Sequence, residues 1–479
     1  MSDYGKDEKQ MLLFSEALTE FADDEMTARV TPVRRILPQI IAGLALGMIT
    51  IEAGAIGKLL PFAGAVLCFN GFRALRRENA WFRAAYFVSL LKLLLAAADV
   101  LLGATAAGES LGSAVLNGWA IAGALLELLR LLALHKGILE VQERAGIARG
   151  GRAVLGLIFW YLVLCVLAFA GWESPVVLAA MLAAYGMILW AISRTVRLLE
   201  SAGYALRPAA GRISDPVPAC LIFGMVLVGL VLCLAFGQRL PMTWQPAEGR
   251  EETAVALRLE ALGVPEEVLE DLSAEDMAGF ENALRALVRR HGFAADPGES
   301  GQEMPWEEAD LVLCDIAIEL PGNVWVMVHH FSWQKTVPLP GTEAYQVWPI
   351  SIQEGWYSDR SVSGRILCSR RGEEICADLP VIMQEEEVSD WFGGTRSQMR
   401  VTSEFSFPQE AEKARGYLIY RMEKPNLTEW TGIDFGVCYT RQEARAVYPF
   451  LRAIEKSSAG PKEGGFCNYR VTEIGMNEE

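Results

Sequence analysis

Residues 216–237 read PVPACLIFGMVLVGLVLCLAFG, and residues 153–172 read AVLGLIFWYLVLCVLAFAGW. Neither stretch contains a charged residue. A helix of about 20 apolar residues crosses a hydrocarbon core of about 30 Å. The two stretches therefore predict membrane-spanning helices, and the rest of the chain is interpreted around them.

Five further apolar stretches extend this pattern, at 36–54, 57–73, 81–103, 113–135 and 175–197. We expect a multi-pass α-helical membrane domain of about seven transmembrane helices. An extracytoplasmic α+β region dominated by a β-sandwich or jelly roll should follow it. The stretch 57–73 is short and contains Lys58 and Pro61, so a re-entrant segment stays open there as the alternative to a full span.

The charge divides between two parts of the chain. Residues 1–240 hold 21 Lys and Arg against 18 Asp and Glu, which leaves 22 and 41 of the totals of 43 and 59 for residues 241–479. The first part is mildly basic and the second strongly acidic. An acidic surface repels nucleic acid, so we expect no nucleic-acid partner.

The basic residues of the short loops predict the orientation, because cytoplasmic loops retain Lys and Arg. Arg29, Arg34 and Arg35 precede the first span. The second junction contains Arg73, Arg76, Arg77 and Arg83, and the fourth contains Lys136, Arg144, Arg149 and Arg152. The sixth junction contains Arg194, Arg197, Arg207 and Arg212. The other junctions carry at most Lys58. Seven crossings then place the N-terminus in the cytoplasm and the acidic part outside, in a plasma membrane.

The domain boundaries follow from the same composition. We expect an acidic amphipathic cytoplasmic head at 1–35, the membrane domain at 36–237, a linker at 238–250, a short helical segment at 251–292 and a β-rich domain at 305–479. The head puts 35 residues before the first apolar run, which favours a signal anchor over a cleavable signal peptide. The head either docks a cytoplasmic partner or lies against the helices as a solvated helix.

Five ionisable residues fall inside the expected spans: Glu52, Lys92, Asp99, Glu127 and Arg130. Charges in a membrane usually face a partner or water. A rise of about 1.5 Å per residue puts Lys92 and Glu127 at similar depths on successive helices, and Asp99 and Glu52 close to Lys58. Ion pairs that fix helix packing and a substrate or ion pathway are the two alternatives. The pair Gly43 and Gly47 also predicts a tight helix crossing.

The region after the spans changes its periodicity. Pro265 and the pair Ser273 and Asp276 are typical of helix starts, and helical spacing continues through Leu284, Leu287 and Val288, so two or three short helices are expected. Beyond 305, alternation such as MRVTSEFSF predicts about seven to ten strands. Another helix is expected at 441–455. His329 and His330 are adjacent on a predicted strand and should point to opposite faces.

Aromatic and sulfur side chains supply the remaining candidates in this part. Trp348, Trp356 and Tyr357 flank a turn-like sequence and are the ligand-contact candidates, with core packing as the alternative. Cys368 and Cys376 flank a predicted hairpin turn at Gly372. A disulfide between them and a set of reduced buried thiols stay open.

We find no motif for a cofactor, a metal or a catalytic residue. We therefore expect a non-enzymatic membrane protein that displays its acidic β-rich domain to a protein, glycan or small ligand, in a sensory or signalling role. A transporter or transporter subunit that uses the intramembrane charges is the alternative, and an envelope enzyme without recognised residues is a third.

Overall fold

The computed structural model describes residues 33–48, 54–109, 111–146, 152–170, 174–201, 216–247, 253–298, 300–349, 357–389, 395–423 and 433–476. The chain divides into two compact units: Met1–Gly103 with Gly108–Val231, and Ala104–Ala107 with Leu232–Glu479. The expected head at 1–35 lies outside the described residues except for its last three. Each unit is considered by itself.

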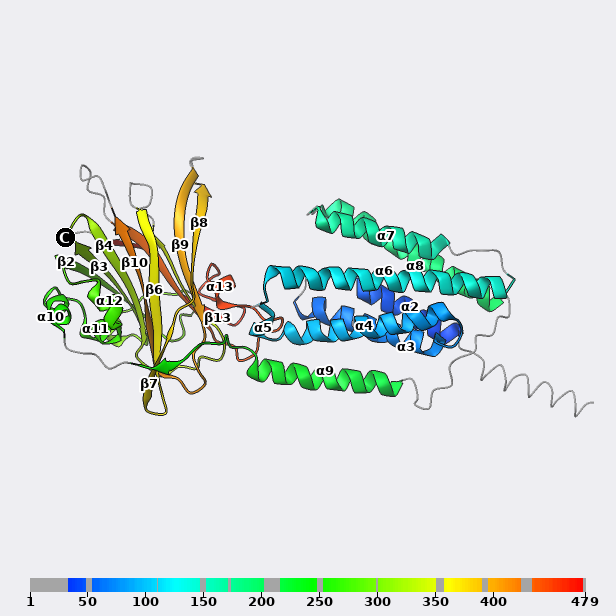
Figure 1. Ribbon diagram of the computed structural model, residues 1–479, viewed down its shortest axis with the longest axis horizontal. Helices are drawn as coiled ribbons and strands as arrows, with labels where there is room; N and C mark the ends of the chain where they lie inside the picture. The colour runs from blue at the N-terminus through cyan, green and yellow to red at the C-terminus, as the bar shows by residue number, and fades with distance from the viewer. Residues whose placement is uncertain are drawn as a thin grey trace, which may run out of the picture. The chain divides into compact units, whose positions relative to one another are not determined.

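The first part of the chain is helical (Figure 1). Its helices are α2 (Val33–Met48), α3 (Ala55–Leu75), α4 (Ala80–Leu102), α5 (Ala106–Glu109), α6 (Ser113–Arg144), α7 (Arg152–Phe169), α8 (Pro175–Ser201) and α9 (Pro216–Phe236). Among the described residues, five helices are long and apolar enough to cross a membrane: those at 55–75, 80–102, 114–144, 175–195 and 217–236. Shorter apolar helices occupy 36–48 and 152–168.

The stretch 57–73, for which a full span and a re-entrant segment were left open, lies in a helix long and apolar enough to cross a membrane. The helix α3 is continuous over 21 residues although Pro61 lies inside it, whereas α2 is described over only 16 residues. Pro61 falls in the second turn of α3, where it removes one backbone donor without ending the helix. Helix α6 is also longer than expected, because it continues past residue 135 to Arg144.

Small residues bring α2 and α3 together. A Cβ atom added at Gly64 would lie 2.6 Å from the Gly43 oxygen and 2.6 Å from the Gly47 nitrogen. The tight crossing expected at Gly43 and Gly47 is therefore confirmed, with Gly64 as the partner on α3. Such contact needs small residues because lipid offers little apolar driving force between helices.

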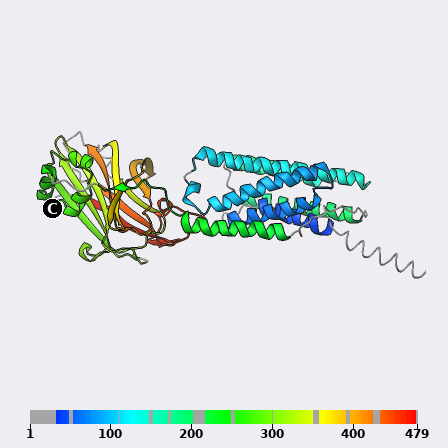
Figure 2. The same cartoon turned by 60° about the horizontal axis from the view of Figure 1, so that its bottom comes forward.

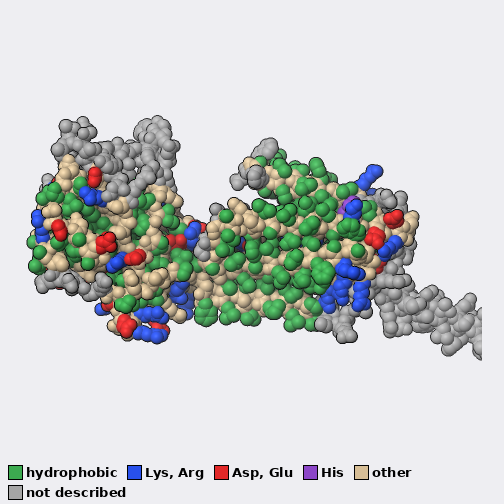
Figure 3. Space-filling view, viewed as in Figure 1, with side chains coloured by type: hydrophobic (Ala, Val, Ile, Leu, Met, Phe, Trp, Pro, Cys, Tyr) green, Lys and Arg blue, Asp and Glu red, His purple; other side chains and the backbone are tan. Residues whose placement is uncertain are grey.

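The surface of the helical unit is apolar. All but four of the exposed large apolar side chains among the described residues lie between Ile56 and Phe236. Hydrophobic side chains cover these helices, and Lys and Arg gather at one end of the unit (Figure 3). At that end Arg144, on α6, donates to the backbone oxygen of Glu78, which follows α3. Apolar helices of this length and exposure indicate a membrane-embedded protein.

The second unit is β-rich and antiparallel. Its strands are β1 (Gln245–Pro246), β2 (Arg285–Phe293), β3 (Leu311–Leu320), β4 (Val324–Trp333), β5 (Glu343–Pro349), β6 (Tyr357–Arg370), β7 (Glu373–Asp378), β8 (Val381–Ser389), β9 (Thr395–Phe405), β10 (Glu412–Glu423), β11 (Ile433–Gln442), β12 (Lys462–Glu463) and β13 (Phe466–Met476). One sheet has the order β1-β7-β6-β10-β4-β3-β2 and the other β12-β13-β11-β5-β9-β8.

The seven-stranded sheet buries both of its faces. One face shares a core with the other sheet, in which Leu313, Phe331 and Tyr439 pack together. The opposite face packs against α10 (Ala254–Ala261), α11 (Glu266–Asp271) and α12 (Ala274–Ala278), with a second core around Leu269 and Val328. These three helices lie against the sheet in both views (Figures 1 and 2).

Two helix predictions in this unit are wrong. Residues 285–293 form strand β2, where Leu287 joins the core between the sheets and Ala286 and Val288 join the core under the helices. Ala286, Leu287 and Val288 place apolar residues on both faces of the strand, so simple alternation is absent and the spacing of Leu284, Leu287 and Val288 imitates a helix. Residues 441–455 contain the end of β11 and the single turn α13 (Ala453–Lys456), because Pro449 cannot continue a helix.

Candidate functional site

The candidate site lies between the three short helices and the outer face of the seven-stranded sheet. Side-chain caps start two of these helices. The Thr253 hydroxyl accepts from the Ala256 nitrogen at 3.2 Å, and the Ser273 hydroxyl accepts from the Asp276 nitrogen at 3.0 Å. The helix start expected at Ser273 and Asp276 is confirmed. These caps fix where α10 and α12 begin above the sheet.

Asp271, the last residue of α11, attaches the helices to the sheet. Its Oδ2 lies 2.8 Å from His330 Nε2 on β4, and its Oδ1 accepts from Arg415 Nε on β10 at 2.7 Å. Arg415 Nη2 donates to Glu374 Oε2 on β7 at 2.8 Å. The Asp271 side chain is only 2% exposed, so burial of its charge depends on these two partners.

A second group of hydrogen bonds holds the start of α12. The Tyr417 hydroxyl donates to Asp276 Oδ2 at 2.7 Å and accepts from the Ser273 nitrogen at 3.1 Å. The Ser363 hydroxyl donates to Asp276 Oδ1 at 2.8 Å. Burial, and then the neighbouring Asp276, raise the pKa of Tyr417, which keeps its proton available for this bond. The helices are thus fixed to β4, β6 and β10 by polar contacts as well as by their apolar core.

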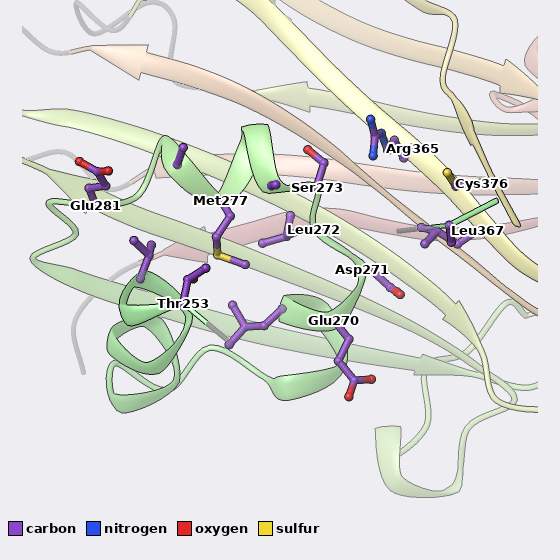
Figure 4. Close-up of a pocket in the computed structure, with 15 residues that line it drawn as sticks. Thr253, Glu270, Asp271, Leu272, Ser273, Met277, Glu281, Arg365, Leu367 and Cys376 are labelled. Carbon is purple, nitrogen blue, oxygen red and sulfur yellow. The ribbon is translucent and has the colours of Figure 1, made fainter. Parts of the chain in front are cut away.

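The helices and the sheet enclose a pocket of about 630 Å³. Its walls are mainly apolar, with side chains from α10 to α12 and from β6 and β7: Ala247, Val255, Leu269, Leu272, Ala274, Met277, Ala278, Leu367 and Cys376. Thr253, Asp271, Ser273 and Arg365 are polar residues of the lining and are spread around the pocket (Figure 4). The volume of this pocket lies within the range of small-molecule sites.

The charges of the pocket are predominantly negative. Glu270 and Glu281 are exposed, and Asp271 is buried. Arg365 is the single basic side chain of the lining, and it lies 3.1 Å from Asp378. Because the oxygens of Asp271 already bind His330 and Arg415, the two glutamates dominate the field at the edge of the pocket. The lining suits an apolar molecule with a cationic or hydrogen-bond-donating group.

The ligand-contact residues suggested by the sequence are not those of the pocket. Trp348 is half-buried opposite Gly436, with the Arg470 guanidinium 4.9 Å from its ring centroid. Trp356 lies outside the described residues, and only the backbone of Tyr357, at the start of β6, is described. The cap at Ser273 places Asp271 between two helices, but it does not indicate that Asp271 contacts the sheet, so the sequence offers no signal for the pocket itself.

Inside the helical unit the structure brings three of the five intramembrane candidates together. Lys92 Nζ, on α4, lies 3.3 Å from Glu127 Oε2 on α6, as their expected depths predicted. Arg130 Nη2 lies 2.6 Å from Glu127 Oε1. Asp99 instead pairs with Lys58 at 2.9 Å, and Glu52 lies outside the described residues.

Cys368 and Cys376 do not form the disulfide that the sequence left open. In the β6–β7 ladder Cys368 pairs with Ile375 and Cys376 pairs with Leu367. The two thiols therefore point to opposite faces of the sheet, one into each core. The Cys376 thiol donates to the Pro246 oxygen at 3.9 Å, and burial raises the pKa of Cys368 to about 12, which disfavours its reactive thiolate.

Within the described ranges, no group of three His, Cys, Asp or Glu side chains could hold a metal ion. No family model matches the chain, and no curated protein matches it. Among solved structures the chain is similar to AvmM, described as catalysing macrocyclization in alchivemycin A biosynthesis. The match has 12% identity, covers 33% of this chain and 82% of AvmM, and has a TM-score of 0.17. A TM-score of that size supports no inference about this chain.

Proposed function

We propose that this is a seven-span plasma-membrane protein whose β-rich unit stands outside the cytoplasm and binds a small ligand in the pocket beneath α10, α11 and α12. The observation that carries the proposal is the pocket of about 630 Å³ with apolar walls and several polar residues in its lining. In the same proposal the protein has a sensory role, in which the helices and the N-terminal head relay ligand binding to the cytoplasm.

The proposed orientation is supported by the distribution of basic residues. Arg76 and Arg77 follow α3, and Arg144 ends α6 beside Glu78. Two basic junctions thus lie at one end of the helical unit. Cytoplasmic ends retain Lys and Arg, so this end faces the cytoplasm in the proposal. Helices α2 and α7, the two shorter apolar helices, complete the seven spans.

The ligand class follows from the lining. Glu270 and Glu281 favour a cation, whereas the walls around Leu269 and Met277 favour a hydrocarbon or aromatic body. We therefore propose an amphipathic amine as the ligand class. Fixed helices keep the pocket preformed, which lowers the entropy cost of binding.

A thermal-shift experiment on the purified full chain tests this proposal with 4-phenylbutylamine as the probe. The amine should raise the melting temperature in a concentration-dependent way, and the anion 4-phenylbutyrate should not. Ala278→Trp fills the pocket and should abolish the shift. Ala261→Trp, an exposed α10 position outside the pocket lining, should keep it. Equal shifts with amine and carboxylate, or an undiminished shift in Ala278→Trp, would reject the proposal.

A transporter is the second candidate, favoured by the buried cluster of Lys92, Glu127 and Arg130. Buried intramembrane charges often mark a translocation path. Charge-neutralising variants separate the two roles. Loss of uptake in a correctly folded variant supports transport, and loss of assembly alone supports a packing role.

A further inference from the structure

The buried ionic cluster in the helical unit carries one more positive than negative charge. Lys92 and Arg130 both contact the single carboxylate of Glu127. Among the described residues, no other acidic side chain is within ion-pair distance of either cation. Arg130 and Glu127 are each 2% exposed, whereas the Lys92 side chain is 22% exposed and also donates to the Gly123 oxygen at 3.0 Å. A net charge buried away from water is costly unless a counter-charge accompanies it.

Arg130 also has donors without acceptors. Its Nη2 contacts both oxygens of Glu127, at 2.6 Å and 2.7 Å. Its Nε and Nη1 are buried and have no hydrogen-bond partner among the described residues. Three of the five N–H bonds of the guanidinium belong to these two atoms. Unpaired donors on a buried charged group are among the most unfavourable features of a protein interior.

The neighbouring polar side chains carry no formal negative charge at neutral pH. Ser89, one turn before Lys92 on α4, is fully buried and its hydroxyl has no partner among the described residues. Tyr185, an electrostatic neighbour of Arg130, donates its hydroxyl proton to the Leu44 oxygen at 2.7 Å. Cys68, another such neighbour, donates to the Ile40 oxygen at 3.7 Å. The environment lacks one acceptor that carries negative charge.

We propose that the helical unit binds a small monoanion of the halide class at the cluster formed by Lys92, Glu127 and Arg130. One negative charge balances the cluster, and a halide accepts from several N–H and O–H donors at once. The surrounding side chains, including Leu131 and Tyr185, are buried, which favours a single small ion over a larger carboxylate. This site is independent of the pocket in the β-rich unit.

Chloride binding to the purified full chain in lipid nanodiscs tests the proposal. The probe is sodium chloride, read by the line width of the ³⁵Cl NMR signal, with sodium gluconate to keep the ionic strength constant. Wild type should show broadening that titrates away when bromide competes. Empty nanodiscs should not show it.

Lys92→Gln is the decisive variant because it leaves Glu127 and Arg130 as a neutral pair. It should weaken chloride binding by at least about tenfold while helical circular dichroism stays unchanged. The matched control is Lys58→Gln, which breaks the half-exposed pair with Asp99 and should bind chloride as wild type does. If Lys92→Gln does not fold, Glu127→Gln replaces it and should tighten binding, since it adds to the positive charge.

Several results would overturn the proposal. They are the absence of competable broadening in wild type, undiminished chloride binding in a folded Lys92→Gln, and weaker binding in a folded Glu127→Gln. Absence of competable broadening in wild type would mean that Lys92 is neutral in the bundle, or that the free N–H groups of Arg130 bind water alone.

Discussion

His330 Nε2 lies 2.8 Å from Asp271 Oδ2, and this contact joins strand β4, in the interior of the seven-stranded sheet, to the end of helix α11. The two residues are 59 positions apart in the chain. Arg415, 144 positions from Asp271, completes the arrangement from β10. The side of the pocket next to the sheet is therefore held by an ionic group whose members come from three separate elements.

Removal of the imidazole should loosen the helices over the pocket. We expect His330→Ala to reduce the free energy of unfolding by about 2 kcal/mol, because Asp271 keeps Arg415 but loses a buried charged hydrogen bond. Thermal unfolding of the purified chain measures this. The matched control is His291→Ala, whose partner Glu303 is 46% exposed and can be solvated by water. Equal losses in the two variants would contradict the role of His330.

A buried acid in the other sheet predicts a pH dependence. Burial raises the pKa of Glu343 well above its usual 4.5, although Arg441 and Tyr439 oppose the shift. The folded state therefore binds more protons than the unfolded state above about pH 4.5, and this group costs stability as the pH rises toward the folded pKa.

Glu343→Gln removes that cost. The stability of the variant relative to wild type should increase with pH between about 5 and 8, by about 1 kcal/mol per pH unit up to the folded pKa. Melting temperatures across this range measure it. In the control Glu410→Gln, where the side chain is 61% exposed, the difference from wild type should stay constant. A constant difference for Glu343→Gln would show that its carboxylate is charged in the fold.

The α2–α3 crossing predicts opposite outcomes for the same substitution at two helical glycines. Gly64→Ala should destabilise the helical unit by about 1–3 kcal/mol, since its Cβ would meet the backbone of Gly43 and Gly47. Gly186→Ala has no atom within 4 Å of the added Cβ and should be neutral or slightly stabilising. Thermal unfolding in detergent compares them. Equal stability of the two variants would contradict the close crossing.

The helical unit could be predicted from the sequence because lipid imposes a simple local rule. A spanning helix needs a long apolar run, and a buried charge needs a partner at its own depth. Those two rules located the helices and the pair of Lys92 and Glu127. They could not locate the orphaned donors of Arg130, which depend on what α2, α3 and α8 bring beside them.

The pocket could not be predicted, because it depends on contacts between distant residues. Ser273 and Asp276 indicate a helix start, but no local pattern says that Asp271 meets His330 and Arg415. The adjacent histidines were assigned correctly to opposite faces: His329 lies 2.6 Å from Asp315 between the sheets, and His330 faces the helices. Strand β2 was mistaken for a helix because the consecutive apolar residues Ala286, Leu287 and Val288 lack the alternation that marks a strand.

The central claim is that the β-rich unit of a multi-pass membrane protein lies outside the cytoplasm, where its pocket meets a ligand. Paired reporter fusions in cells test this most directly, with alkaline phosphatase active only outside and green fluorescent protein folding only inside. At Glu479 the phosphatase fusion should be active and the fluorescent fusion dark, and at Ala148, in a basic junction, the reverse should hold. Fluorescence at Glu479 without phosphatase activity would contradict the claim.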